Sequence, residues 1–198
     1  MGLIDKLTAI GDGFRSSRGT TKKYTLDEMA VLAGEKTGGG DDGSFKAVIE
    51  RTATEITLPS DLTSIGDYAF YYYSKLVSIS LPDGLTSIGS AAFNNCSQLV
   101  SISLPNGLTK IGSNAFYFCS KLALTSLPAG LTSIGGSAFY NCSALQEITF
   151  NSKPSINSTA FKNCYQLHTI NVPWAEGEVA NAPWGATNAT INYNYTGG

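Results

Sequence analysis

The sequence predicts a β-rich solenoid of leucine-rich-repeat type, in which about five repeats of 22–23 residues stack through parallel strands. Two dipeptides recur at a fixed interval. Leu-Pro begins, at steps of 23 residues, at Leu58, Leu81, Leu104 and Leu127. Ala-Phe begins, with a last step of 22 residues, at Ala69, Ala92, Ala115, Ala138 and Ala160. A period in this range is typical of a repeat that contributes one strand-containing turn to a solenoid.

Each repeat divides into four short parts. The Leu-x-x-Ile-x-Leu-Pro segment of residues 76–82 ends in alternation of period two, which predicts a strand with one buried side. Pro82 follows where its missing N–H costs no ladder hydrogen bond. Residues 85–89 predict a second short strand on the opposite wall, and residues 92–96 predict a single helical turn that returns the chain.

One repeat cannot fold alone. Its roughly six large apolar side chains contribute about 1.5–3 kcal/mol each when buried. Ordering its 23 residues costs roughly 1–2 kcal/mol per residue in backbone entropy. The repeats must therefore bury one another's edges, as expected for a linear stack with special ends.

The cysteines occupy one column of the predicted stack. They are spaced by 23, 23 and 22 residues, at Cys96, Cys119, Cys142 and Cys164. Disulfides, a metal site and a ladder of small buried side chains are the alternatives. We expect buried, reduced thiols, because parallel side chains suit packing and because zinc sites need a Cys-x-x-Cys spacing that is missing beside the lone His168.

The full pattern, Leu-x-x-Ile-Gly-x-x-Ala-Phe-x-x-Cys-x-x-Leu-x-x-Ile-x-Leu-Pro, resembles the BspA-like (Treponema-type) leucine-rich repeat family from Ile56 to about Pro173. The resemblance implies a bacterial surface protein used for adhesion and protein binding. Three positions depart from the pattern. Tyr73 replaces Cys, Thr125 replaces Ile and Asn151 replaces Pro, which marks the two ends of the stack and one strand position as irregular.

Residues 1–35 differ from the repeats and predict a helical anchor or oligomerisation segment. A capping box from Thr25 to Glu28 opens the second of two short helices. The alternative is that both helices pack on each other or on the end of the solenoid. The apolar positions of the predicted anchor are Leu3, Ile4, Leu7, Ile10, Phe14, Met29 and Leu32.

Residues 2–10 and 24–29 resemble the N-terminal segment of virion and tail-associated proteins of bacteriophages and prophages of gut bacteria. The resemblance implies a virion structural or adhesion protein, such as a tail fibre or decoration protein, that is made in the host cytoplasm. It would be a homo-oligomer and would contact other virion proteins through this segment. The sequence as written has no secretory signal, since Asp5, Lys6 and Asp12 interrupt any apolar region.

The rest of the chain divides into three further parts. Residues 36–44 form a Gly-rich linker, and residues 45–173 form the solenoid, which opens with a capping strand at residues 45–49. Residues 174–198 form the C-terminal cap. There Trp174 and Trp184 are expected to cover the last repeat, and residues 190–195 alternate like a final strand.

Two surfaces of the repeats are candidates for recognition. The first is the small, hydroxyl-rich outer face of the main strands, which includes Ser78, Ser101 and Asn171. The second is a column of aromatic side chains interleaved with Asn, whose rings supply apolar area and whose amides supply hydrogen bonds. Its candidate ligand-contact residues are Tyr71, Tyr72, Tyr117, Phe118, Tyr140 and Tyr165. The alternative is that these rings only cover the backbone of the turns.

Composition excludes several classes of function. A net charge of −2 with 14% charged residues gives no basis for binding nucleic acid, and no apolar run is long enough for membrane insertion. We find no paired carboxylates, phosphate-binding loop or nucleophile with a base, so we expect no enzyme activity, no cofactor and no metal. The leading hypothesis is a non-enzymatic virion protein that presents the repeats to a host surface protein or glycan. The alternative is a bacterial cell-surface or secreted BspA-like binding protein.

Overall fold

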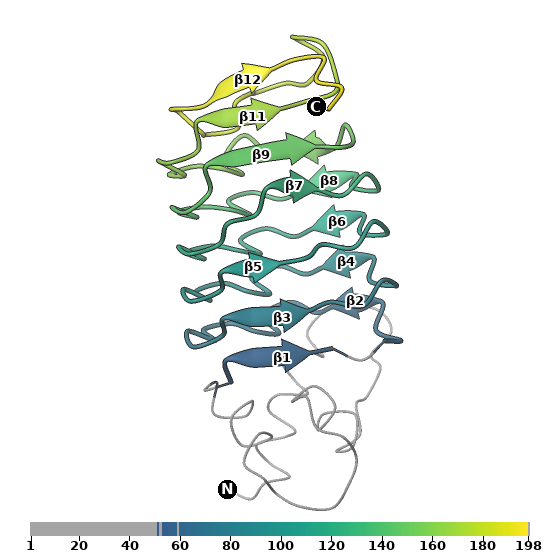
Figure 1. The fold of residues 1–198 in the computed structure, drawn as a ribbon, viewed down its shortest axis with the longest axis vertical. Helices are drawn as coiled ribbons and strands as arrows, with labels where there is room; N and C mark the ends of the chain where they lie inside the picture. Colours follow the sequence, from purple (N-terminus) through teal and green to yellow (C-terminus); the bar gives the residue numbers. More distant parts are fainter. Residues whose placement is uncertain (1–50, 52, 59, 198) are drawn as a thin grey trace, which may run out of the picture.

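The computed structural model describes residues 51, 53–58 and 60–197 of the 198-residue chain. This part of the chain winds into coils that stack along one axis, from β1 at one end to β12 at the other (Figure 1). Every strand pairing among the described residues is parallel, and no described residue lies in a helix. The predicted solenoid of parallel strands is confirmed. The helical turn predicted at residues 92–96 is wrong, because the chain makes non-helical turns there and Asn95 has a φ of 62°.

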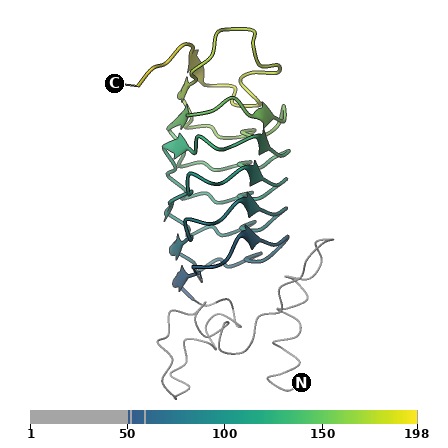
Figure 2. The same ribbon diagram turned by 90° about the vertical axis from the view of Figure 1, so that its right-hand side faces the viewer.

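The strands form two rows on opposite walls (Figures 1 and 2). The first row contains a three-stranded and a four-stranded sheet, formed by β1 (Glu55–Thr57), β3 (Ser78–Ser80) and β5 (Ser101–Ile102), and by β7 (Ser126–Leu127), β9 (Glu147–Phe150), β11 (Thr169–Asn171) and β12 (Thr190–Asn192). The second row is one five-stranded sheet of β2 (Ser64–Ile65), β4 (Ser87–Ile88), β6 (Lys110–Ile111), β8 (Ser133–Ile134) and β10 (Ser155–Ile156).

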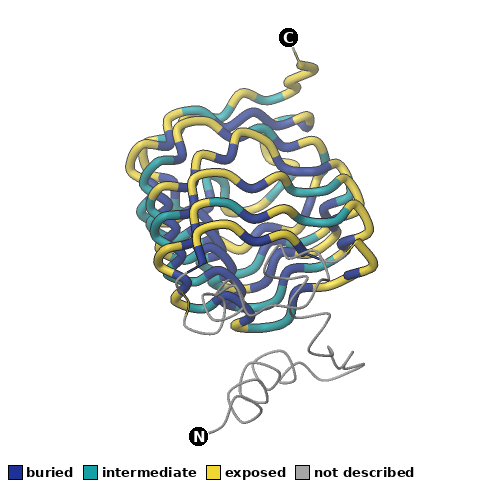
Figure 3. Tube along the Cα trace, turned by 60° about the horizontal axis from the view of Figure 1, so that its bottom comes forward, coloured by how far each residue is buried: buried dark blue, intermediate teal, exposed yellow. Residues whose placement is uncertain are grey.

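The strand register follows the repeat period. Ile56 pairs with Ile79, and Ile79 pairs with Ile102, so identical side chains lie one above the other. In the second row, Ile88 and Ile111 pair in the same way. These side chains are buried between the two walls, and the outward neighbours are exposed or half-exposed (Figure 3). The alternation of period two in the sequence therefore corresponds to strands with one buried face, as predicted.

The first row is interrupted at Thr125. A Thr in the inward Ile column would bury a hydroxyl group, and burial of an unpaired polar group is costly. Instead Leu124 is buried and Thr125 is exposed, so the inward position moves by one residue here, while β7 keeps its 23-residue register with β9. As a result β5 and β7 do not pair, and the row splits into two sheets there. The irregularity that the sequence indicates at this position is confirmed.

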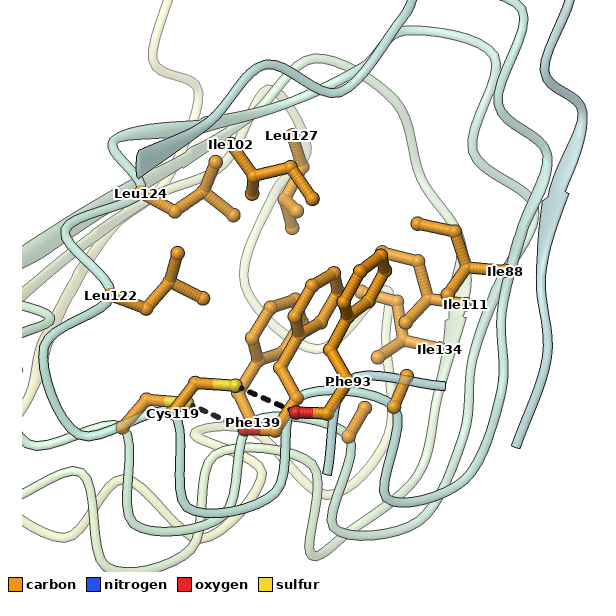
Figure 4. Packing of buried hydrophobic residues seen from close by; sticks show 14 of the residues in the cluster. Ile88, Phe93, Ile102, Ile111, Cys119, Leu122, Leu124, Leu127, Ile134 and Phe139 are labelled. Atoms are coloured by element: carbon orange, nitrogen blue, oxygen red, sulfur yellow. Dashed lines mark hydrogen bonds between the residues drawn. The ribbon is translucent and has the colours of Figure 1, made fainter. Parts of the chain in front are cut away.

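A stack of phenylalanine rings runs through the core. Consecutive rings lie 5.1–5.3 Å apart between centroids and within 9° of parallel, at Phe70, Phe93, Phe116, Phe139 and Phe161. Figure 4 shows the rings of Phe93 and Phe139 between Leu122 and Leu124 on one side and the Ile column of the second row on the other. Because each ring is at most 2% exposed, the stack buries apolar area on every coil and fixes the distance between coils.

The four cysteines are free and buried, which confirms the predicted ladder of reduced thiols. Each Sγ donates a hydrogen bond to the carbonyl oxygen of a stacked Phe one coil back, as Cys119 does to Phe93 at 3.1 Å (Figure 4). Burial raises the pKa of the Cys96 and Cys164 thiols to about 12. The same cause places the pKa values of Cys119 and Cys142 well above the usual range.

Glycine follows the buried Ile in the second row because two backbones meet there. A Cβ atom built on Gly112 would lie 2.6 Å from the backbone of Gly89, and one on Gly135 would lie 2.5 Å from the backbone nitrogen of Ser113. Such distances are shorter than real Cβ contacts, so only glycine allows the coils to approach this closely.

The C-terminal cap covers the last coil. Trp174 and Trp184 are buried, and their rings contact Phe150 with centroid distances of 5.6 Å for both. Strand β12 pairs in register with β11, Ile191 opposite Ile170. The predicted covering role of the tryptophans is confirmed, and the final strand expected at residues 190–195 forms over Thr190–Asn192 only.

Three predictions lie outside the described residues. They are the helical segment 1–35 with its apolar positions, the linker 36–44 and the capping strand 45–49.

Candidate functional site

The aromatic column of the sequence lies on the turn that follows the phenylalanine stack. Two residues follow each stacked Phe, and we call them the outer pairs: Tyr71-Tyr72, Asn94-Asn95, Tyr117-Phe118, Tyr140-Asn141 and Lys162-Asn163. Backbone hydrogen bonds link each pair to the next. The amide of Tyr72 donates to the carbonyl of Asn94 at 2.8 Å, and that of Asn95 donates to Tyr117 at 2.8 Å. The outer pairs therefore form one continuous column along the axis.

The second member of every outer pair has a left-handed backbone. The values of φ are 60° at Tyr72, 62° at Asn95, 57° at Phe118, 57° at Asn141 and 63° at Asn163. This conformation reverses the chain just before the buried Cys column. Asn tolerates it because its short side chain bonds locally, whereas a bulky aromatic residue is a genuine outlier there.

Three tyrosines gather on the first coil. The ring centroid of Tyr71 lies 5.6 Å from that of Tyr68 and 4.6 Å from that of Tyr72, both in edge-on geometry. Tyr68 is 53% exposed and Tyr72 is 49% exposed. The pKa of Tyr71 is raised, first by desolvation and then by the neighbouring Tyr72. The same hydroxyl is hydrogen-bonded to the Tyr72 side chain, so the two phenols are linked within this group.

A second group of rings lies two coils further along. Tyr117 and Tyr140 stack with centroids 4.7 Å apart and an interplanar angle of 13°, and Phe118 packs beside both. Asn163 donates from Nδ2 to the Tyr140 hydroxyl at 2.7 Å. Phe118 is 38% exposed, while Tyr117 and Tyr140 are half-buried. This group presents one free ring and the edges of two stacked ones.

The structure groups the predicted contact residues differently from the sequence. Tyr165 is 58% exposed but follows Cys164, so it lies outside the outer pairs, and no ring contact is found for it within the described chain. Tyr68, which the sequence analysis did not include, belongs to the first group of rings. Tyr68 directly precedes Ala69, and the residues at the same position of the next three coils, Ala91, Asn114 and Ser137, also have positive φ. That shared position is the signal that marks Tyr68.

The outer pairs carry little charge. From the first to the fourth pair every side chain is Tyr, Phe or Asn, and Lys162 is the first charged member. Asn95 donates from Nδ2 to Oδ1 of Asn94 at 2.5 Å. The column is therefore a neutral strip of rings and amides.

The other candidate surface, the outer face of the first row, is partly occupied by its own hydrogen bonds. Asn171 is buried and donates from Nδ2 to the carboxylate of Glu147 at 2.7 Å, and its Oδ1 accepts from Asn192 at 2.8 Å. These groups bind one another across β9, β11 and β12. This end of the face therefore offers few free polar groups to a ligand.

The described residues contain no group of three or more His, Cys, Asp or Glu placed to hold a metal ion. His168 is exposed, and its Nδ1 lies 2.9 Å from the hydroxyl of Thr169. Within the described ranges no helix has the length and apolar character needed to cross a membrane.

Parallel coils that stack with this repeat place the chain in the class of leucine-rich-repeat solenoids. The model of the family described as BspA type leucine rich repeat region matches residues 43–173 in six copies, so the chain belongs to that family. The family expected from the repeat pattern is confirmed. The expected number of about five repeats was too low, because the first copy begins before the first Leu-Pro.

Two solved structures show the same fold. A leucine-rich repeat protein of T. pallidum is 29% identical with a TM-score of 0.61, over 72% of this chain and 70% of that one. A leucine-rich repeat protein from Bacteroides ovatus is 37% identical with a TM-score of 0.55, over 61% of this chain and 32% of that one. The chain thus corresponds to about a third of the second protein. No curated protein matches the sequence.

Proposed function

We propose that this chain is a non-enzymatic binding protein of the adhesion type, displayed on a bacterial surface or secreted, and that the outer pairs with Tyr68 and Tyr165 are its contact surface. Membership of the BspA-type family supports a binding role. A solenoid suits this role because neighbouring coils present a long, rigid surface.

One observation carries the choice of surface. Tyr72 and Phe118 occupy left-handed positions at which Asn95, Asn141 and Asn163 serve the same turn. A bulky residue there costs about 1–2 kcal/mol in backbone energy, and Asn reduces that cost. Their rings are also partly exposed and contact only other rings of the outer pairs, so they add nothing to the buried core in return. Exposed aromatic residues that cost stability are typical of contact sites, where rings supply most of the binding energy.

A catalytic role has less support. The carboxylates of the repeats lie on separate coils and several already have partners, since Asp67 accepts from the amide of Ser90 and Glu147 accepts from Asn171. Catalysis by carboxylates needs two such groups on either side of one substrate bond. The described coils bring no such pair together with a base or an oxyanion site.

The second candidate is a virion protein anchored by residues 1–35, which rests on the resemblance of residues 2–29 to virion proteins. Those residues lie outside the described ones, and the similarities reported above give this candidate no support. Two observations separate the candidates. Genes for capsid and tail proteins next to this one, together with loss of particle incorporation when residues 1–35 are deleted, would favour the virion. Neighbouring cell-envelope genes and unchanged behaviour of the deletion would favour the cell surface.

The test of the proposed surface uses the full chain and the double variant Tyr117→Ala, Tyr140→Ala. Binding is measured by surface plasmon resonance on immobilised mucin and laminin and on fixed epithelial cells. We expect the chain to bind at least one of these probes, and the variant, still folded by circular dichroism, to bind it at least tenfold more weakly. The matched control is Val77→Ser with Val100→Ser, which removes two exposed apolar side chains from another face. Equal binding by the aromatic variant, or no binding of the unaltered chain to any probe, would contradict the proposal.

A further inference from the structure

The column of outer pairs changes character at one coil. Tyr71-Tyr72 precedes and Tyr117-Phe118 follows the pair Asn94-Asn95, which contributes two amides and no ring. The backbone is continuous through this step, since Tyr72 donates to Asn94 and Asn95 donates to Tyr117. The two groups of rings are therefore held at a fixed separation by the coil between them.

The distance between adjacent coils equals the distance between two stacked rings. Adjacent strands, and hence adjacent coils, lie about 4.8 Å apart. The Tyr117 and Tyr140 rings, on consecutive coils, stack at 4.7 Å, which shows that side chains at this position lie face to face at the coil spacing. Tyr71 and Tyr117 are two coils apart, so their positions are separated by about 9.6 Å. The coil between them carries the short Asn94 side chain in place of a ring, so the column of rings has a step of one ring there.

The floor of this space is polar. Asn95 donates to Oδ1 of Asn94, which leaves the Asn94 amino group and the Asn95 carbonyl group with no hydrogen bond to another described residue. Both residues are half-buried, so a ligand placed over them must offer these groups hydrogen-bond partners in place of solvent. An aromatic side chain of a protein partner would leave them unpaired, which costs about 1–3 kcal/mol per group.

A sugar ring suits both the flanking tyrosine rings and the polar floor. Its C–H faces supply apolar area to the flanking tyrosine rings, and the hydroxyl groups of its rim donate to and accept from the two amides. The surrounding outer pairs carry no charge, so they offer no counter-ion to an acidic sugar or a phosphate. A neutral glycan therefore fits the site better than an anionic one.

We propose that Asn94 and Asn95, flanked by Tyr71 and Tyr117, form a subsite for one pyranose ring of an extended neutral glycan that runs along the solenoid axis. Tyr72 and Phe118 contact the neighbouring sugars on either side. This inference rests on the proposed function, because it assigns a ligand class to the same column of residues.

The test is a titration of the ¹⁵N-labelled full chain with cellohexaose, chitohexaose and maltohexaose, followed through the side-chain amide signals of Asn94 and Asn95. We expect these two signals to shift with one of the extended β-linked oligosaccharides, and at least tenfold weaker binding of the coiled α-linked maltohexaose. The variant Asn94→Tyr places a ring in the space, as Tyr71, Tyr117 and Tyr140 do on their own coils. It should fold normally and bind the oligosaccharide at least tenfold more weakly.

The matched control is Asn106→Tyr, which adds the same ring to an exposed Asn in the Pro-Asn-Gly turn of the same repeat. Oligosaccharide binding by Asn94→Tyr that equals that of the control would overturn the subsite. If no oligosaccharide moves the two signals while the Tyr117→Ala, Tyr140→Ala variant still loses binding to mucin or laminin, the glycan subsite fails and the proposed function stands, with a protein as the partner. If the aromatic variant also binds normally, both proposals fail.

Discussion

Two columns of side chains run the length of the solenoid one residue apart, and they follow opposite rules. The inner column is the phenylalanine stack, which has the same residue on all five coils from Phe70 to Phe161. The outer column begins at the next residue and contains Tyr, Asn, Tyr, Tyr and Lys in turn. The inner residues contact their equivalents on both neighbouring coils, so a change on one coil disturbs two interfaces. The outer residues are free to vary, which is what a recognition surface requires.

The largest difference between the columns should appear in stability. Phe116→Ala removes a fully buried ring from the middle of the stack and should lower the free energy of unfolding by about 3–5 kcal/mol. Tyr117→Ala, at the next residue, removes a half-buried ring that contacts Tyr140 and Phe118, and should cost less, about 1–3 kcal/mol from two aromatic pairs. Urea unfolding of the two variants measures the difference. Equal losses would show that the outer ring is part of the core.

The glycine positions provide the next comparison. Gly112→Ala places a methyl group against the backbone of Gly89 and should cost about 1–3 kcal/mol through overpacking. Gly84→Ala is the matched control, because a Cβ atom there meets nothing within 4 Å. The control should change stability by no more than about 0.5 kcal/mol, as other surface substitutions do. A Gly112→Ala variant as stable as its control would mean that the coils are less closely packed than described.

The cysteine column predicts an alkaline limit to stability. The pKa of Cys96 is about 12 in the folded chain, above the value of about 8.5 for a free thiol, because burial disfavours the thiolate. Since the folded pKa is raised, the contribution to stability is fully present below about pH 8.5 and is lost as the pH rises toward the folded value.

Cys96→Ala should therefore flatten the decline in unfolding free energy between pH 9 and 11 by about 1.4 kcal/mol per pH unit. Urea unfolding at a series of pH values measures the slope, and the constant cost of the smaller side chain cancels between pH values. A slope unchanged by the substitution would show that this thiol ionises in the folded protein.

The periodic residues of the sequence predicted the fold well, because each Ile, Phe, Gly and Cys meets its own copy one period away. The compensation at Thr125 was only partly predictable. The missing Ile marked the position, but the inward turn of Leu124 depends on the space between two particular coils. The left-handed backbone of Tyr68, Tyr72 and Phe118 was not predicted, since no local pattern distinguishes these positions from ordinary turn residues. Their grouping with Tyr71 and Tyr117 depends on the stacking of the coils, so the structure was needed to see two groups of rings with an amide step between them.

The most direct test of the central claim replaces the first and third outer pairs by Asn-Asn, the sequence of the second pair. In this variant Tyr71, Tyr72, Tyr117 and Phe118 are all replaced by Asn, and the inner column is left unchanged. Unfolding free energy and binding to mucin, laminin and fixed cells are measured on the same preparation. The account predicts a loss of free energy well below that of Phe116→Ala, because Asn suits the two left-handed positions better than an aromatic residue and so offsets the lost ring contacts, together with at least a tenfold loss of binding. Retained binding, or a loss of stability as large as that expected for Phe116→Ala, would contradict it.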